Sequence, residues 1–189
     1  GHGTALLNAA KQQCAALHDP ARSFLGWEQE GWLGQQLQAD AASASNAPRW
    51  SQLVQTTLFA ARKHPNGKQS TDSWDGYPEA RQRLVRQISE TRPRNAVLLG
   101  GDIHQNYVCS IPALSDEAPG QDNPVVASEF CGTSISSHSG TTQAKADAIA
   151  RNSPQVVYAR SEERGYSLVE ITPQRMTTEL RAVQDPLKA

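Results

Sequence analysis

Residues 95–107 read NAVLLGGDIHQNY, and this stretch indicates how the 189-residue chain is organised. Its apolar run is short and continuous and ends in Gly100-Gly101, as expected of a strand that is buried on both faces. Such strands occur in α/β proteins, whose open sheets bind ligands just beyond the carboxyl ends of the strands. We therefore expect an α/β fold with a ligand site close to the Gly-Gly step.

Asp102 and His104 follow that step directly, two residues apart. In an extended segment this spacing places both side chains on the same side of the backbone. Hard cations prefer carboxylate oxygen and transition metals accept imidazole nitrogen, so the pair predicts part of a metal site. Taken alone, the spacing favours a simpler alternative, in which Asp102 caps a turn and His104 is a hydrogen-bonded surface residue, because D-x-H is common by chance.

Residues 72–78 end a long polar stretch and read DSWDGYP. The segment fits the start of a helix, because its acidic residues favour a helix N-terminus, its glycine permits a turn and its proline suits the first helical position. That account does not explain two large aromatic residues in polar surroundings. An equally weighted interpretation therefore makes the segment one wall of a substrate pocket, with the candidate residues Asp72, Trp74, Asp75 and Tyr77.

Residues 129–138, EFCGTSISSH, close a strand-like run and continue into a series of hydroxyl side chains. Loops rich in serine and threonine usually satisfy their own backbone groups. Ser134 and Ser136 would nevertheless lie near a ligand at a strand end, and they are further pocket candidates. The segment is not a nucleophile elbow, because Ser136 stands where the G-x-S-x-G frame requires glycine.

Periodicity outlines the rest of the chain. Apolar residues at helical spacing and residue propensities predict helices over residues 4–17, 25–39, 78–92 and 143–152. Strand-like patterns cover residues 50–59, 95–99, 107–111, 125–130, 166–171 and 176–183, and residues 61–77 are predicted to be a long loop. The length is that of one domain, so residues 1–189 are expected to form a single one.

Composition excludes several classes of protein. Eighteen basic and 19 acidic residues give a net charge of −1, which offers no electrostatic support for nucleic-acid binding. No apolar run approaches the 18 residues of a membrane span, and no charged and apolar leader suggests an export signal within this chain. The three cysteines are far apart and odd in number, so neither a disulfide framework nor a zinc site is expected.

Five segments together carry a family resemblance: LGWEQEGWL (25–33), DSWDGYPEAR (72–81), VLLGGDIHQNY (97–107), EFCGTSISS (129–137) and RGYSLVEIT (164–172). In order and spacing they resemble the C-terminal half of the alkaline phosphatase D, or PhoD-like, branch of the calcineurin-like metallophosphoesterases. The resemblance covers about residues 20–175. It implies the C-terminal half of an α/β/β/α sandwich, hydrolysis of phosphate esters at a bimetallic site holding Fe and Ca, and a periplasmic or extracellular location.

By that resemblance, Gly101-Asp102-Ile103-His104 matches the family's G-D-x-H motif, and Asp102 and His104 become metal ligands. The family's other ligand motifs, which belong to its N-terminal half, have no counterpart in this chain. One Asp and one His cannot hold two ions, so the isolated chain is expected to be inactive or weakly active and to bind metal weakly or not at all. An alternative is a non-catalytic module that keeps the fold and binds a phosphorylated ligand or a protein.

Half of a two-sheet sandwich also leaves an apolar sheet face uncovered. We expect either a homo-oligomer or the missing N-terminal half of the protein to cover that face.

Overall fold

The computed structural model describes residues 6–8, 15–43, 48–115 and 117–184. A five-stranded mixed sheet lies at its centre, in the order β2-β4-β6-β5-β7. Its strands are β2 (Ser51–Val54), β4 (Ala96–Gly100), β5 (Asn106–Pro112), β6 (Val125–Cys131) and β7 (Val156–Arg160). Strands β2, β4 and β6 are parallel, whereas β5 runs antiparallel to both of its neighbours.

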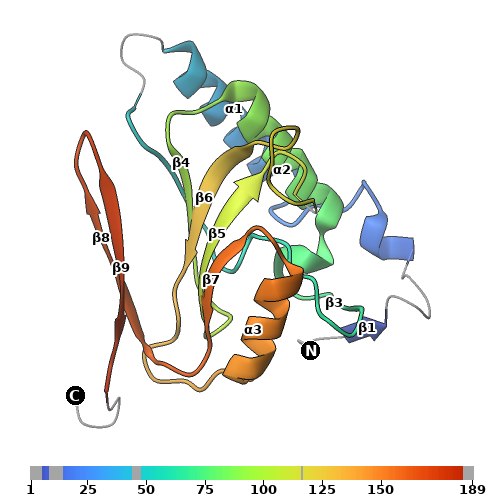
Figure 1. Ribbon diagram of the computed structural model, residues 1–189. Helices are drawn as coiled ribbons and strands as arrows, with labels where there is room; N and C mark the ends of the chain where they lie inside the picture. The colour runs from blue at the N-terminus through green and yellow to red at the C-terminus, as the bar shows by residue number, and fades with distance from the viewer. Residues whose placement is uncertain (1–5, 9–14, 44–47, 116, 185–189) are drawn as a thin grey trace.

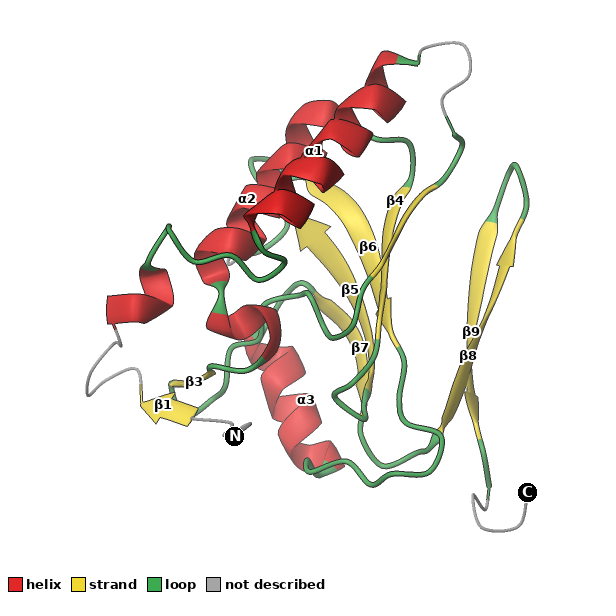
Figure 2. Ribbon diagram, turned by 180° about the vertical axis from the view of Figure 1, so that it is seen from behind, coloured by secondary structure: helices red, strands yellow, loops and turns green. Residues whose placement is uncertain are grey.

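Helices cover one face of this sheet and a hairpin stands over the other, as Figures 1 and 2 show from opposite sides. The helices are α1 (Trp27–Ala42), α2 (Pro78–Thr91) and α3 (Gln143–Asn152), and the hairpin is β8 (Gly165–Ile171) with β9 (Met176–Ala182). The α/β prediction is confirmed. Within the described residues, the layers correspond to part of the expected sandwich, with helices on one side only.

The core forms between the sheet and the helices, where the apolar side chains of the strands face the apolar side of the helices. Strand β4 turns Ala96 and Leu98 toward the helices. Helix α2 packs against them with an apolar stripe of buried residues: Ala80, Leu84, Val85 and Ile88. The αL residue Arg92 ends α2, and its amide donates to the carbonyl oxygen of Ile88. Cys109 and Cys131 lie in the same core as free thiols.

The hairpin is attached to the sheet at both of its ends. At its turn, the indole nitrogen of Trp50 donates to the carbonyl oxygen of Thr172 over 2.8 Å, and at its base the amide of Gly165 donates to Ser134. These two contacts hold β8 and β9 beside the central sheet (Figure 1). No helix among the described residues is long and apolar enough to cross a membrane.

Several expected elements differ from the observed ones. The predicted helix over residues 4–17 is wrong where it can be compared: β1 (Leu6–Asn8) pairs antiparallel with β3 (Lys68–Ser70), a 3-10 turn occupies Ala15–His18, and residues 9–14 lie outside the described part. Strand pairing overrides the helix propensity of this alanine-rich stretch. Strand β7 was not predicted, and the expected strand over 50–59 ends early, at Val54. The single-domain organisation of residues 1–189 stays a prediction.

The segment DSWDGYP forms a short 3-10 helix, Ser73–Gly76, directly before α2. Its central carboxylate is buried: Asp75 is 4% exposed and pairs with Arg81 at 2.9 Å and with Arg62 at 3.2 Å. A side chain at Gly76 would overlap the main-chain oxygen of Thr71. Through the buried Asp75 and the close contact at Gly76, this segment anchors the end of the loop before α2 in the core.

This ion-pair cluster gives the first prediction. Asp75→Asn leaves the Arg81 guanidinium, which is 2% exposed, with one anionic partner fewer in the interior. We expect a loss of about 3–5 kcal/mol in the free energy of unfolding, measured by urea denaturation. Asp72→Asn is the matched control, because Asp72 is exposed and asparagine can still accept from the Ser73 amide. Equal stabilities of the two variants would contradict the prediction.

Candidate functional site at the carboxyl ends of the parallel strands

The chain leaves β4 through a tight turn rather than an extended segment. Asp102 has φ 69° and His104 has φ 57°, and the amide of Ile103 donates to the carbonyl oxygen of Gly101 over 2.8 Å. The expectation of an extended backbone is therefore wrong, and the alternation argument that placed both side chains on one side does not apply. Non-glycine residues in this left-handed region are uncommon, and such strain concentrates at functional sites.

Asp102 is exposed and is held from the neighbouring strand. The hydroxyl of Thr57, in the loop after β2, donates to Oδ2 of Asp102 over 3.1 Å. The two residues are 45 positions apart in the sequence. They meet because β2 and β4 are parallel, so that their carboxyl ends lie at the same edge of the sheet.

His104 is half-buried, and its ring is fixed by the loop after β6. Its Nδ1 lies 3.1 Å from the main-chain oxygen of His138. A carbonyl oxygen can only accept, so Nδ1 donates, and in the neutral ring this tautomer leaves the lone pair on Nε2. Metal-ligating histidines are commonly oriented by such a hydrogen bond.

The Gly-Gly step between β4 and Asp102 is enclosed by both neighbouring strands. A side chain at Gly100 would overlap the main-chain oxygen of Thr57. On the other side, the amide of Gly132 donates to the carbonyl oxygen of Gly100 over 3.0 Å. The thiol sulfur of Cys131 lies 3.4 Å from the carbonyl oxygen of Gly101. The turn that carries Asp102 and His104 is thus fixed by contacts with the ends of β2 and β6.

The loop after β2 is itself tied down by two side chains. Just after β2, the side-chain amide of Gln55 bonds both the main-chain oxygen and the main-chain nitrogen of Thr57. The carboxylate of Glu129, on β6, accepts from the amides of Phe59 and Ala60 over 2.7 and 2.8 Å. Glu129 is fully buried, and burial raises its pKa to about 7, against the opposing effect of these two amides, Arg62 and Arg81.

The remaining pocket candidates lie in different surroundings. Asp72 caps the 3-10 helix, Asp75 is in the ion-pair cluster, and Tyr77 packs edge-on against Phe24 beneath the guanidinium of Arg22. Ser134 donates to the main-chain oxygen of Ser137, and Ser136 is exposed on the same loop. The two segments are thus engaged mainly in local structure, and their role in a substrate pocket stays a prediction.

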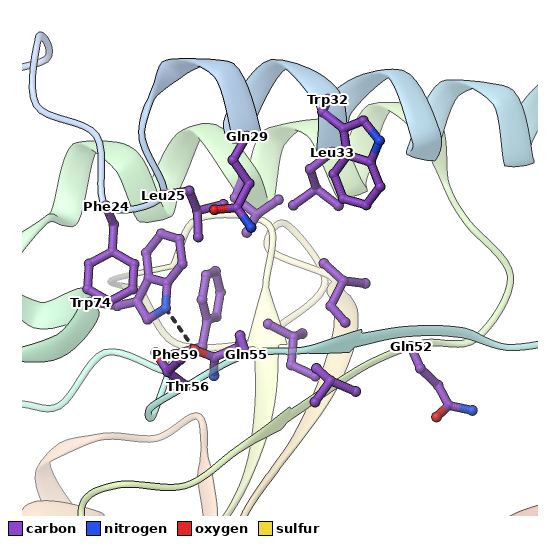
Figure 3. A pocket seen from close by; sticks show the side chains of 14 residues that line it. Phe24, Leu25, Gln29, Trp32, Leu33, Gln52, Gln55, Thr56, Phe59 and Trp74 are labelled. Atoms are coloured by element: carbon purple, nitrogen blue, oxygen red, sulfur yellow. Dashed lines mark hydrogen bonds between the residues drawn. The ribbon is translucent and has the colours of Figure 1, made fainter.

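A cavity of about 520 Å³ opens elsewhere, between α1 and the edge strand β2 (Figure 3). Of the predicted pocket residues, only Trp74 lines it. The Trp74 indole packs against Phe24 and Phe59, with ring centroids 4.4 and 4.9 Å apart, and donates to Oε1 of Gln55. Asp102 and His104 do not line this cavity, so the cavity and the predicted metal ligands are separate features.

The donor types at the strand ends suit a cation, although they are few. The exposed Asp102 carboxylate and the Nε2 of His104 are both usual ligands. Within the described residues, no group of three or more His, Cys, Asp or Glu side chains is placed to hold a metal ion. The pair can therefore form only part of a coordination shell.

Three residues that support this turn were not predicted. Glu129 carries a signal in hindsight, because it alternates with the buried Ala127 and Cys131 and places a charge on the core face of β6. No signal in the sequence points to Thr57 or to the main-chain oxygen of His138, because their roles depend on which loops the sheet brings together.

These features define an α/β protein with a polar site at the carboxyl ends of its parallel strands. A family model described as "PhoD-like phosphatase" matches residues 4–180, beyond the predicted 20–175, and the chain belongs to this family. It is 29% identical over 170 residues to alkaline phosphatase D of Bacillus subtilis (strain 168), covering 87% of this chain and 27% of that protein.

The fold has a solved counterpart as well. The chain superimposes on the structure of PhoD with a TM-score of 0.73 and 30% identity, over 86% of this chain and 30% of that one. The family resemblance and the fold class are thereby confirmed. The chain spans less than a third of the length of each of these two relatives.

The buried carboxyl group gives the second prediction. The pKa of Glu129 is about 7 in the folded protein against an ordinary value of 4.5. Between pH 4.5 and pH 7 the folded state therefore binds more of this proton than the unfolded state does. Stability should therefore fall as pH rises from about 4.5 through 7, by on the order of 3 kcal/mol. Glu129→Gln should flatten this slope, as measured by urea denaturation at pH 5, 6, 7 and 8.

The exposed Glu170 on β8 offers a control, because Glu170→Gln should leave the pH dependence as it is. An unchanged slope in Glu129→Gln would show that Glu129 titrates in the folded protein as it does in the unfolded chain.

Proposed function

We propose that this chain supplies one part of the metal centre of a phosphoric ester hydrolase, with Asp102 and His104 as its ligands. The observation that carries the proposal is the hydrogen bond from His104 Nδ1 to the His138 carbonyl oxygen, which leaves Nε2 available to a cation. Membership of the PhoD-like phosphatase family and the G-D-x-H motif support it.

Each residue would have a separate task. His104 would coordinate through Nε2, and Asp102 would contribute carboxylate oxygen while its Oδ2 also accepts from Thr57. When bound, divalent or trivalent cations stabilise negative charge on a phosphoryl group and activate water. The Ser134–Ser136 loop leads from β6 to His138 and lies beside the base of the β8–β9 hairpin, and its hydroxyls would border a substrate bound there.

The isolated chain should turn over little or no substrate, because two ligands are too few for a dinuclear centre. The other ligands would come from a different part of a full-length protein, whose relative is more than three times as long as the matched segment. Iron and calcium as its metals, and a periplasmic or extracellular location, stay predictions from the family resemblance.

A second function, a non-catalytic module that binds phosphate groups or a protein, is favoured by the small number of donors among the described residues. The hydroxyls and amides of residues 132–137 could bind phosphate oxygens without a cation. Metal dependence separates the two functions, since only the first requires Asp102 and His104 to bind an ion.

The third prediction is that the purified chain binds a cation weakly through these two ligands. In isothermal titration calorimetry with Mn²⁺ and with Ca²⁺, we expect one weak site whose affinity falls at least about tenfold in His104→Ala and in Asp102→Asn. His138→Ala is the matched control, because His138 contributes its main-chain oxygen rather than its ring.

The assignment would be overturned if only His138→Ala lost cation binding. It would also be overturned if neither His104→Ala nor Asp102→Asn changed the affinity. In parallel, hydrolysis of p-nitrophenyl phosphate and of its bis-ester is assayed with the same ions. Robust turnover that His104→Ala abolishes would show that a complete site forms within this chain.

We further propose that the isolated chain associates through an open edge of its sheet. Strand β2 ends the sheet, and Val54 on it is 77% exposed. Tyr166, Leu168 and Ile171 on the hairpin are exposed as well. Unpaired edges with apolar side chains attract further strands, which would be those of a second copy here or those of the missing half in a full-length protein.

The fourth prediction is a homo-oligomer in solution, measured by size-exclusion chromatography with light scattering. Val54→Lys should shift the population toward monomer, because a lysine on an edge strand opposes pairing. Val157→Lys serves as the control on β7, the opposite edge, where Val157 is 69% exposed. A monodisperse wild-type monomer would contradict the prediction.

A further inference from the structure

We propose that Thr57 is a positioning residue, which fixes the Asp102 carboxylate in the orientation that a cation requires. This inference rests on the proposed function and adds to it a residue from the loop after a different strand, β2. Its starting point is the 3.1 Å hydrogen bond from the Thr57 hydroxyl to Oδ2 of Asp102.

Asp102 needs such support because its own surroundings restrain it little. The side chain is exposed, and its backbone is in the left-handed region, which is sparsely populated for residues with a side chain. A carboxylate in this position can rotate about χ1 and χ2 unless a neighbour holds it. The Thr57 hydroxyl engages one carboxylate oxygen, Oδ2, and leaves Oδ1 to face other partners.

Thr57 is well held for this task. It is buried, and its β-branched side chain has few rotamers. The side-chain amide of Gln55 bonds both its main-chain nitrogen and its main-chain oxygen, and the Trp74 indole donates to the same Gln55 oxygen. The position of the hydroxyl is therefore set by the core rather than by solvent.

A buried carboxylate anchors the next part of the loop. Glu129 accepts from the amides of Phe59 and Ala60, two and three residues after Thr57. The absence of a side chain at Gly100 lets the Thr57 carbonyl approach the end of β4. Thr57 thus connects a rigid part of the core to a ligand that the backbone of its own turn leaves loosely held.

The experiment measures Mn²⁺ affinity by isothermal titration calorimetry in the wild-type chain and in three threonine variants. Thr57→Val keeps the shape of the side chain and removes the hydroxyl, and we expect it to weaken binding about 10- to 100-fold. Thr57→Ser restores the hydroxyl and should bind within about threefold of wild type. Thr56→Val, at the exposed neighbouring position, should bind as the wild type does.

A double-substitution cycle separates positioning from general stability. If Thr57 acts through Asp102, then Thr57→Val should weaken Mn²⁺ binding far less in an Asp102→Asn background than in the wild type. Equal losses in the two backgrounds would overturn the positioning role. So would wild-type affinity in Thr57→Val.

The outcomes distinguish this inference from the proposed function. Asp102-dependent Mn²⁺ binding that Thr57→Val leaves intact overturns only the role of Thr57. Wild-type chain that shows no Mn²⁺ binding dependent on Asp102 overturns the proposed function, and the role of Thr57 with it.

Discussion

The contact between the Glu129 carboxylate and the amides of Phe59 and Ala60 is the constraint on which the candidate site depends. It links β6 to the loop after β2, and β4 lies between these two strands in the sheet, so the contact joins the two outer strands of the parallel set. A buried charge is expensive unless it is hydrogen-bonded, and here the loop supplies both donors. The geometry of the loop and the ionisation of the carboxyl group are therefore linked.

The turn after β4 gains its shape from neighbours rather than from its own sequence. Thr57 lies on one side of it, and Cys131, Gly132 and the carbonyl of His138 lie on the other. Parallel strands that end at one edge bring these distant segments together. The donors available at that edge are a carboxylate and an imidazole, and under the proposed function the other ligands of a dinuclear centre would come from outside the described residues. The turn is consequently well ordered, although the described residues supply few donors for a cation.

Much of the fold could be predicted from patterns along the chain. The apolar stripe of α2, the buried run of β4 and the alternation of β8 and β9 each depend on neighbours a few residues away, and each was predicted close to its observed bounds. The strand β1 and the early end of β2 were not predicted, because β1 depends on pairing with β3 and the length of β2 depends on its pairing with β4. For the same reason the motif pointed to Asp102 and His104, whereas Thr57 and Glu129 became evident only with the fold.

The left-handed backbone at Asp102 and His104 has a consequence for how such a chain can be altered. Glycine adopts this conformation without the steric cost of about 1 kcal/mol that a side chain incurs. Selection for thermal resistance alone would thus favour glycine at both positions and would erase the donor atoms in doing so. If the two side chains bind a cation as proposed, stability and function make opposite demands on this turn, and stabilising substitutions are better sought outside it.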